Sequence, residues 1–464
     1  MKNNLVIKSG IWYTISNFLV GGIGFITTPI FTRLLTQEEF GAFNNFTSWV
    51  SILGVIVALN MESTLISARY EYEDRLDEYI FSILSLSMIS TICWWGLVNV
   101  FMDQAVGFFE MNPVYINGMF VYLLTQPAIK VFQARESFFY RYKVSATLSI
   151  LLSVGASLFS VLLVVTMSNR LDGRVYGMIL PNILIGAILM LYFVIAGKKL
   201  NIGYWKYALK IALPFIPHLL SLTFLNMIDR IMITKICGEK AVALYSIGYT
   251  VALIITILLQ SLNGAIAPWI GENLAKKQYE SIRETSKVYI LLFMYLAIGI
   301  MLVSPEILLV MGGASYIDAK WIMIPISLGC VCQFLYSLFV NVEQFEKKTV
   351  GMAVASVSAA VLNFVLNAWL IPIYGYVAAA YTTLAGYLWL LLVHMYLVYK
   401  YKMSQVYSYR FVALSLIVVS IIAIFINLLY VWNWIRYLVL AVYILATLLI
   451  GWKNKDKIIG FVKK

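Results

Sequence analysis

The sequence predicts an all-α integral membrane protein with 14 transmembrane helices, which form two six-helix lobes followed by a C-terminal two-helix hairpin. Three observations support this fold class: the composition, the spacing of the apolar segments and a weak internal repeat. Of the 464 residues, 62% are hydrophobic and 12% are charged, whereas roughly 25% are charged in an average soluble domain. Such a chain needs the bilayer as its solvent. A cytosolic enzyme, a secreted disulfide scaffold and a nucleic-acid-binding module with one short anchor are therefore excluded.

Fourteen apolar segments are long enough to cross a hydrocarbon core of about 30 Å. The first follows a basic N-terminus and has no small-residue cleavage site, so we expect a retained span rather than a signal peptide. Short connections join the segments. The expected spans are residues 11–31, 42–62, 80–101, 114–133, 147–167, 175–197, 211–234, 241–262, 288–311, 321–342, 349–371, 376–399, 411–431 and 434–452.

The distribution of Lys and Arg predicts the orientation. If the N-terminus is cytoplasmic, the cytoplasmic segments hold 26 of these residues and the outer loops hold 7, with Arg230 inside the seventh span. Cytoplasmic loops carry such an excess, so we expect both termini in the cytoplasm. The net charge of +12 is then explained by topology and by attraction to anionic lipids. Nucleic acid is not needed as a partner.

A weak internal repeat relates the two halves of the chain. In its longest match, each copy runs from the end of one expected span through an outer loop to the start of the next span. Six spans is an even number, so the copies have the same orientation, as in transporters that bind substrate between two halves. The matches, at offsets of 201 or 202, pair residues 32–43 with 234–245, 115–117 with 316–318, and 173–175 with 375–377.

This repeat predicts three parts. Residues 1–200 form an N-lobe of spans 1–6, and residues 201–402 form a C-lobe of spans 7–12. Residues 403–464 add spans 13 and 14 and a basic cytoplasmic tail. Because one chain supplies both lobes, we expect a monomer.

Three segments carry a resemblance to a known family. Residues 29–41, residues 213–231 and residues 366–380 resemble the Wzx-type polysaccharide repeat-unit flippases of the multidrug/oligosaccharidyl-lipid/polysaccharide (MOP) exporter superfamily. Lipid II flippases of that superfamily often carry an Arg pair in the first helix, where this chain has Ser16 and Asn17. The polysaccharide branch is therefore favoured.

The resemblance implies a substrate and a cellular location. The substrate would be an undecaprenyl-pyrophosphate-linked oligosaccharide, moved by alternating access from the cytoplasmic to the outer leaflet of a bacterial cytoplasmic membrane. The product would serve capsule, O-antigen or a related surface polysaccharide, with a polysaccharide polymerase as a partner. Three alternatives remain: a multidrug antiporter of the same superfamily, a polymerase or glycosyltransferase, and a structural membrane protein.

Basic residues at the cytoplasmic ends of spans are candidate ligands of the pyrophosphate. Arg69, Lys130 and Arg135 lie where the substrate would arrive, and arginine binds phosphate oxygens in a bidentate manner. The alternative is that they only set the topology. Glu62 is a candidate carrier of a coupling proton or sodium ion, or a neighbour of Arg69.

The seventh span is a candidate gating element. His218 and Asp229 are eleven residues apart, which places them on nearly the same helix face, about 16 Å apart along the axis. Ionisable groups inside a span are costly and usually face a cavity or a partner. Pro214 and Pro217 each remove a backbone donor and should kink the helix. We expect these four residues to act in coupling or gating, or else to fix the bundle.

Polar residues at a spacing of four predict two further stripes. Asn226 and Arg230 share one face of the seventh span, and Asn363 and Asn367 share one face of the eleventh. We include all four among the candidate substrate ligands. Hydrogen bonding between helices is the default role for such asparagines.

The cysteines and histidines predict no metal site. The chain has 4 Cys and 2 His, without the spacing of a zinc or iron–sulfur motif. We expect no catalytic residues, no cofactor and no covalent chemistry. A proton or sodium gradient is the candidate energy source, and the sequence leaves open whether a coupling ion is needed.

Overall fold

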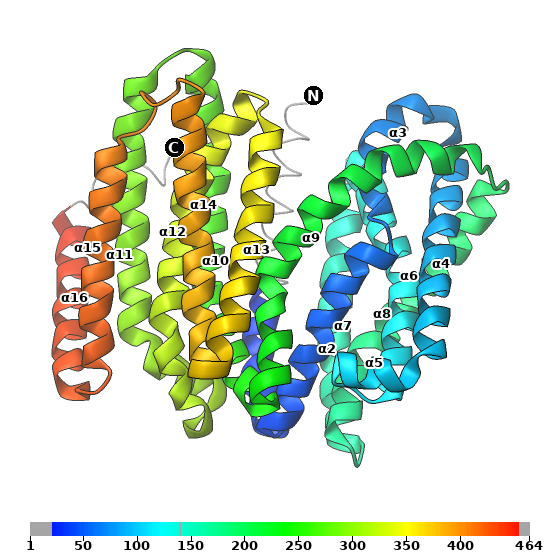
Figure 1. Cartoon of the computed structure of the whole chain (residues 1–464), viewed down its shortest axis with the longest axis horizontal. Helices are drawn as coiled ribbons and strands as arrows, with labels where there is room; N and C mark the ends of the chain where they lie inside the picture. Colours follow the sequence, from blue (N-terminus) through cyan, green and yellow to red (C-terminus); the bar gives the residue numbers. More distant parts are fainter. Residues whose placement is uncertain (1–20, 140, 454–464) are drawn as a thin grey trace. The chain divides into compact units, whose positions relative to one another are not determined.

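The computed structural model describes residues 21–139 and 141–453, and every regular element in these ranges is a helix (Figure 1). Much of the first expected span, including Ser16 and Asn17, and most of the basic tail lie outside the described residues. Residues 21–34 are helical. The labelled α-helices are α2 Gln37–Val57, α3 Leu65–Glu71, α4 Leu76–Val100, α5 Met102–Phe109, α6 Pro113–Phe138, α7 Tyr142–Thr166, α8 Arg170–Gly197, α9 Gly203–Cys237, α10 Glu239–Ala275, α11 Tyr279–Gly312, α12 Lys320–Phe345, α13 Thr349–Tyr374, α14 Tyr376–Lys400, α15 Tyr409–Leu429 and α16 Asn433–Lys453.

Each expected span after the first corresponds to one of these helices. Within the described ranges, 10 helices can cross a membrane by length and apolar composition, and the bent helix α9 makes 11. Helix α6 is not among them; its polar residues are described below. The apolar part of α16 is Asn433–Leu449, which is shorter than a full span. The number 14 therefore stays a prediction. The short helices α3 and α5 were not expected.

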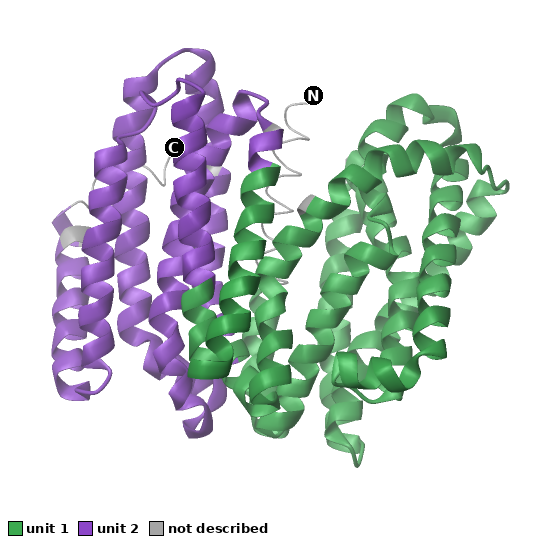
Figure 2. Cartoon of the chain, viewed as in Figure 1, with its two compact units in different colours: residues 1–246, 353–382 green, residues 247–352, 383–464 purple. Residues whose placement is uncertain are grey.

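The chain forms two compact units (Figure 2). Unit 1 contains residues 1–246 and 353–382, and unit 2 contains residues 247–352 and 383–464. Helices α10, α13 and α14 each contribute to both units. The lobes that the repeat predicts have other boundaries, and they stay a prediction.

Unit 1 has two apolar cores, and α9 contributes to both. One core joins α2, α5, α6 and α8 to the second half of α9, where Ile228 and Ile231 are buried. The other joins α3, α4 and the ends of α6 and α8 to the first half of α9, where Tyr204 and Ala208 are buried. The two halves of α9 therefore pack against different partners within the unit.

A bend in α9 separates these two halves. The axes of Gly203–Pro217 and Leu219–Cys237 differ by 43°. Pro214 and Pro217 lie just before the bend, where each removes a hydrogen-bond donor and its ring displaces the preceding turn. The predicted kink is confirmed. His218 lies at the bend, but its side chain is outside the described part of the structure.

Glycines let α8 approach its neighbours closely. A Cβ atom on Gly177 would lie 2.2 Å from the Ser160 Cα of α7, and one on Gly186 would lie 2.7 Å from the Thr125 carbonyl oxygen of α6. Such distances are well inside van der Waals contact. Helices α6, α7 and α8 therefore form a tight group in which small residues set the spacing.

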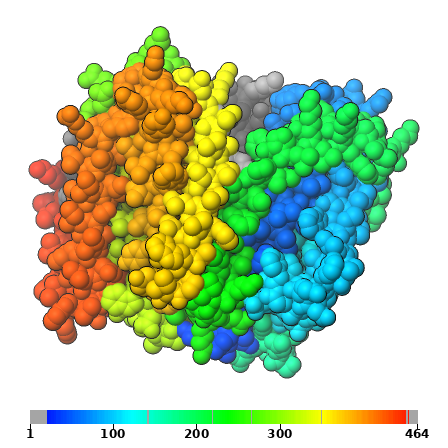
Figure 3. Space-filling model, viewed as in Figure 1, coloured from blue at the N-terminus to red at the C-terminus, as the bar shows by residue number. Residues whose placement is uncertain are grey.

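Unit 2 is built around α12. In the span Ala314–Phe345, which contains this helix, 83% of the apolar stretch is buried. The terminal hairpin α15–α16 is fixed to α11 by an ion pair. Arg436 is 1% exposed, and its two terminal nitrogens donate to the Glu306 carboxylate at 2.5 and 2.7 Å. The outer face of α15 is apolar, with Ile417, Ile421 and Leu428 exposed at helical spacing. Figure 3 shows this helix, in orange, at the surface of the unit. Such a face is typical of contact with lipid.

Candidate functional site

Among the predicted phosphate ligands, Arg135 is already engaged by carboxylates. Its Nε and Nη2 donate to Asp77 at 3.0 and 3.3 Å, and its Nη1 donates to Glu136 at 2.8 Å. A phosphate would have to displace both acids. Arg69 donates to the Phe138 carbonyl oxygen at 3.1 Å and remains partly exposed. Of these two arginines, only Arg135 forms an ion pair with a carboxylate of the described residues.

Glu62 and Lys130 form an ion pair. Their Oε1 and Nζ atoms are 3.5 Å apart, and the side chains are 23% and 37% exposed. Arg69, the neighbour considered for Glu62, forms no ion pair with it in the described part of the chain, because Glu62 lies in the 3₁₀ turn Met61–Thr64 and Arg69 lies in the following helix α3. Two residues seven apart share a face only in an unbroken helix.

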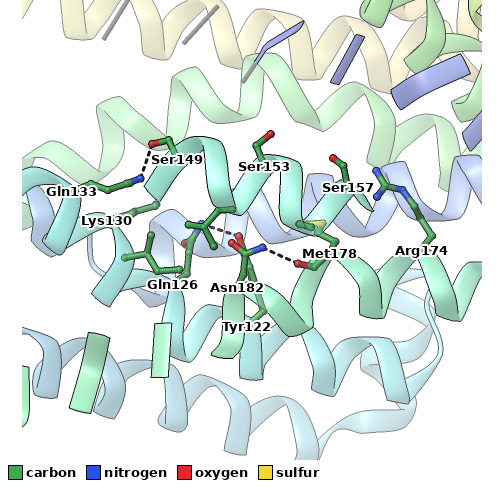
Figure 4. Close-up of a pocket in the computed structure, with 13 residues that line it drawn as sticks. Tyr122, Gln126, Lys130, Gln133, Ser149, Ser153, Ser157, Arg174, Met178 and Asn182 are labelled. Atoms are coloured by element: carbon green, nitrogen blue, oxygen red, sulfur yellow. Dashed lines mark hydrogen bonds between the residues drawn. The ribbon is translucent and has the colours of Figure 1, made fainter. Parts of the chain in front are cut away.

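The structure contains a polar groove between helices α6, α7 and α8 of unit 1 (Figure 4), which we call the α6–α8 groove. Its volume is about 410 Å³, within the range of roughly 300–1,000 Å³ that small-molecule sites occupy. The lining includes no Asp or Glu. The lining residues are Tyr122, Gln126, Ile129, Lys130 and Gln133 of α6, Ser149, Leu152, Ser153, Ala156 and Ser157 of α7, and Arg174, Met178 and Asn182 of α8.

Regular spacing explains why the polar side chains meet in this groove. On α6 and α7 they recur every three or four residues, and on α8 Arg174 and Asn182 are eight residues apart, so on each helix they lie along one face. Gln133 donates to the Ser149 hydroxyl at 2.8 Å, which joins α6 to α7. Gln126 donates to the Tyr122 hydroxyl at 3.3 Å, while its own Oε1 is buried without a hydrogen-bond partner among the described residues. The groove therefore has unused hydrogen-bonding capacity.

Arg174 is the cation at the end of the groove opposite Gln133 (Figure 4). Its Nη1 donates to the Ser160 hydroxyl at 3.0 Å. Its guanidinium lies 3.7 and 4.0 Å from the ring centroids of Phe31 and Phe43. Its Nε is buried without a hydrogen-bond partner in the described part of the chain. No carboxylate of the described residues forms an ion pair with it.

A second polar site, the Asp229 cluster, joins four helices of unit 1. It consists of Asp229, Tyr245, Asn363, Asn367 and Thr382, all at most 1% exposed. Asn367 donates to Asp229 Oδ1 at 2.5 Å and to Asn363 Oδ1 at 3.1 Å. The hydroxyl of Tyr245 donates to Asp229, and that of Thr382 donates to Asn367. The hydrogen bonding between helices that we expected is confirmed for Asn367, which bonds to α9 and α14, whereas its bond to Asn363 lies within α13. Their role as substrate ligands stays a prediction.

Arg230 and Asn226 lie beside this cluster on α9. Arg230 donates to the Asn226 carbonyl oxygen at 2.8 Å and to the Ser246 hydroxyl at 3.3 Å. The expected neighbourhood at a spacing of four is therefore present. Nothing in these contacts tests substrate binding by either residue, or gating by Pro214 and Pro217.

Sequence reasoning missed most of the α6–α8 groove and a buried acid–base pair. Of the groove, only Lys130 was among the predicted residues; the serines at a spacing of four on α7 were the available signal. In unit 2, His394 Nδ1 lies 3.0 Å from Glu343 Oε1. These residues are 2% and 0% exposed. The two residues are 51 positions apart on different helices, and the sequence alone does not show that these helices pack together.

The described residues contain no group of three or more His, Cys, Asp or Glu that could hold a metal ion. The Asp229 cluster offers oxygen atoms from a carboxylate, amides and hydroxyls instead. Oxygen donors of this kind suit hard cations rather than transition metals.

Comparison with known proteins identifies related chains. Residues 6–274, more than half of the chain, match the family described as polysaccharide biosynthesis protein, and residues 214–369 match MatE. A protein of the Lsg locus of Haemophilus influenzae is 23% identical over 353 residues, which cover 72% of this chain and 84% of that protein.

Solved structures show the same fold. The lipid II flippase MurJ in an inward closed conformation has a TM-score of 0.69 at 15% identity, covering 97% of this chain and 100% of that one. An inward-facing multidrug resistance transporter of the MATE family has a TM-score of 0.59 at 15% identity, covering 83% of this chain and 95% of that one. The chain thus has the fold of multi-pass membrane transporters.

Proposed function

Because the chain belongs to the polysaccharide biosynthesis protein family of the MOP superfamily, we propose that it is a flippase for undecaprenyl-pyrophosphate-linked oligosaccharides. It moves these repeat units from the cytoplasmic to the outer leaflet of the bacterial cytoplasmic membrane, for capsule, O-antigen or a related surface polysaccharide. Both termini are cytoplasmic in this proposal, the protein is a monomer, and a polysaccharide polymerase takes the delivered unit.

The observation that carries the proposal is the charge of the α6–α8 groove. Its lining includes Lys130, which pairs with Glu62 outside the lining, and Arg174, which has no carboxylate partner among the described residues, but no acidic residue. A site for cationic drugs needs negative charge, because recognition depends on complementary potentials. A hydroxyl-rich glycan with an anionic group needs hydrogen-bond donors, acceptors and cations, which this groove supplies. The multidrug antiporter is therefore the weaker reading.

The transport cycle follows from these features. The polar glycan and its pyrophosphate enter a wet cavity, while the prenyl chain stays in lipid, since moving the polar head through hydrocarbon is costly. Arg69, partly exposed beside Phe138, contacts the anionic head on the cytoplasmic side. Alternation between inward-open and outward-open states then exposes the glycan outside.

Coupling is assigned to the Asp229 cluster. Asp229 is a buried carboxylate on the bent helix α9, held by Tyr245 and Asn367. Intramembrane carboxylates of this kind commonly mark proton or ion pathways. We propose that a proton or a sodium ion binds here, and that its presence changes the hydrogen bonds that join α9 to α13.

Deletion of the gene in its own host tests the function. We expect surface polysaccharide to be lost and undecaprenyl-linked repeat units to accumulate on the cytoplasmic side, with both defects reversed by a plasmid copy. Intact polysaccharide together with new sensitivity to cationic dyes would show a drug antiporter instead. Transfer of a labelled lipid-linked oligosaccharide across liposomes containing the purified protein then distinguishes direct flipping from an indirect effect.

A further inference from the structure

We propose that the α6–α8 groove is the subsite that binds the glycan portion of the substrate, and that Arg174 binds an oxyanion carried by it. This inference rests on the proposed function and adds the place and the chemistry of recognition. The oxyanion is either the pyrophosphate or the carboxylate of an acidic sugar. Both groups present two neighbouring oxygen atoms that arginine binds in a bidentate manner.

The first argument is the unused hydrogen-bonding capacity of the groove. Ser153 and Ser157 of α7 line it. They form no hydrogen bond with another described residue. Gln126 Oε1 is buried without a partner in the described ranges. The two serines are partly exposed, whereas Gln126 Oε1 is a buried atom, and buried polar atoms in native proteins nearly always have a partner, which can be a ligand or water. A sugar ring offers donors and acceptors on both faces and would satisfy these atoms.

The second argument is the state of Arg174. A guanidinium has five N–H donors, and here one hydrogen bond is made, to Ser160. The remaining neighbours are the aromatic rings of Phe31 and Phe43, which stabilise a cation but neutralise no charge. Intramembrane cations are usually paired or face an aqueous cavity. Arg174 has the cavity beside it, so an anionic ligand there gains a charge-assisted hydrogen bond.

The third argument is the rigidity of the walls. Gly177 and Gly186 bring α8 into direct contact with α7 and α6, so the walls of the groove are closely packed.

The fourth argument is the distribution of charge. At the end of the groove opposite Arg174, Lys130 is neutralised by Glu62, whereas no carboxylate among the described residues pairs with Arg174. The groove is thus polar along its length, with its uncompensated charge at one end. This asymmetry orients a ligand that is neutral over most of its length and anionic at one point.

Two substitutions test the subsite independently. Arg174→Gln removes the charge, and Ser157→Leu fills the groove without touching the guanidinium. Matched controls are Arg170→Gln, which changes an arginine one turn earlier on α8 that contacts the Leu34 carbonyl oxygen, and Leu158→Phe, which changes an exposed position on α7. Amount and folding are checked by fluorescence-detected size exclusion, so that a variant that fails to fold is recognised.

Binding is measured by calorimetry on the purified full chain in detergent, with three probes. These are the host's lipid-linked oligosaccharide with a shortened prenyl chain, the same glycan released from the lipid, and inorganic pyrophosphate. We expect both groove variants to weaken binding of the lipid-linked probe by tenfold or more, and both controls to leave it within twofold. Surface polysaccharide in the deletion host should follow the same order.

The probes also identify the oxyanion. If Arg174→Gln weakens binding of inorganic pyrophosphate and spares the released glycan, Arg174 binds the pyrophosphate. If it weakens binding of the released glycan alone, Arg174 binds a sugar carboxylate. Wild-type affinity for all three probes in both groove variants would overturn the subsite. The flippase itself would still stand if deletion of the gene abolishes surface polysaccharide, so the two failures are distinguishable.

Discussion

Replacement of Gly177 by alanine should destabilise the protein by forcing α7 and α8 apart. The new Cβ would lie 2.2 Å from the Cα of Ser160, whereas carbon atoms in contact are about 3.5–4.0 Å apart. The helices must therefore separate by about 1.3–1.8 Å. The clash is with backbone, which no side-chain rotation relieves, so the overpacking cost of about 1–3 kcal/mol applies. The better helix propensity of alanine offsets about 1 kcal/mol, leaving a net loss of up to about 2 kcal/mol. Compared with a glycine-to-alanine change at an open helix position, which has the same propensity gain, the loss is about 1–3 kcal/mol.

Gly155→Ala is the matched control, because a Cβ at this position of α7 meets no atom within 4 Å. It should be neutral or slightly stabilising. Thermal unfolding of both variants in detergent, followed by tryptophan fluorescence, measures the difference. Because Gly177 also sets the spacing of the α6–α8 groove, its variant should lower surface polysaccharide as well. Equal stability of the two variants would refute the close α7–α8 contact.

Three further predictions follow from other parts of the structure. Asp229→Asn should abolish the dependence of flipping in liposomes on an imposed sodium or proton gradient. The control Asp103→Asn, at an exposed position, should retain this dependence. If flipping by the Asp229→Asn variant still depends on the gradient, the coupling role of Asp229 is contradicted. Arg436→Gln should cost about 2–3 kcal/mol, since it breaks charged hydrogen bonds to a partly exposed Glu306; the double variant with Glu306→Gln should lose less than the sum in thermal unfolding. Pro217→Ala should reduce the 43° bend of α9, measured by pulsed EPR between spin labels at its two ends, and an unchanged distance would exclude Pro217 as its cause.

The helices were predictable from sequence because hydropathy alone marks a span in lipid. Short elements were not, because α3 and α5 have 7 and 8 residues, too few for a periodic signal. The asparagine pair on α13 was identified from its spacing of four. Its bond to Asp229, 138 residues away, depends on the packing of two distant helices, and one sequence carries no information on that packing.

Arg174 was missed because of a helix boundary. The expected sixth span began at residue 175, so Arg174 was counted as an outer-loop charge. Helix α8 begins at Arg170, and Asn169 caps it by accepting hydrogen bonds from the backbone N–H groups of Leu171 and Asp172. Asparagine is a preferred N-cap, so the signal was present. With the boundary moved by one turn, the same residue becomes an intramembrane cation.

The bend of α9 also makes its first half a lever arm. The segment Gly203–Pro217 is about 21 Å long at 1.5 Å per residue, so a rotation of about 10° at the bend carries its far end through about 4 Å. That end is embedded by Tyr204 and Ala208 in the core it shares with α3 and α4, which would travel with it. The Asp229 side of the bend stays with the other core. Under the proposed coupling, binding of one small cation near the bend is thus amplified into a displacement of about 4 Å, roughly three-quarters of the 5.4 Å pitch of an α-helix.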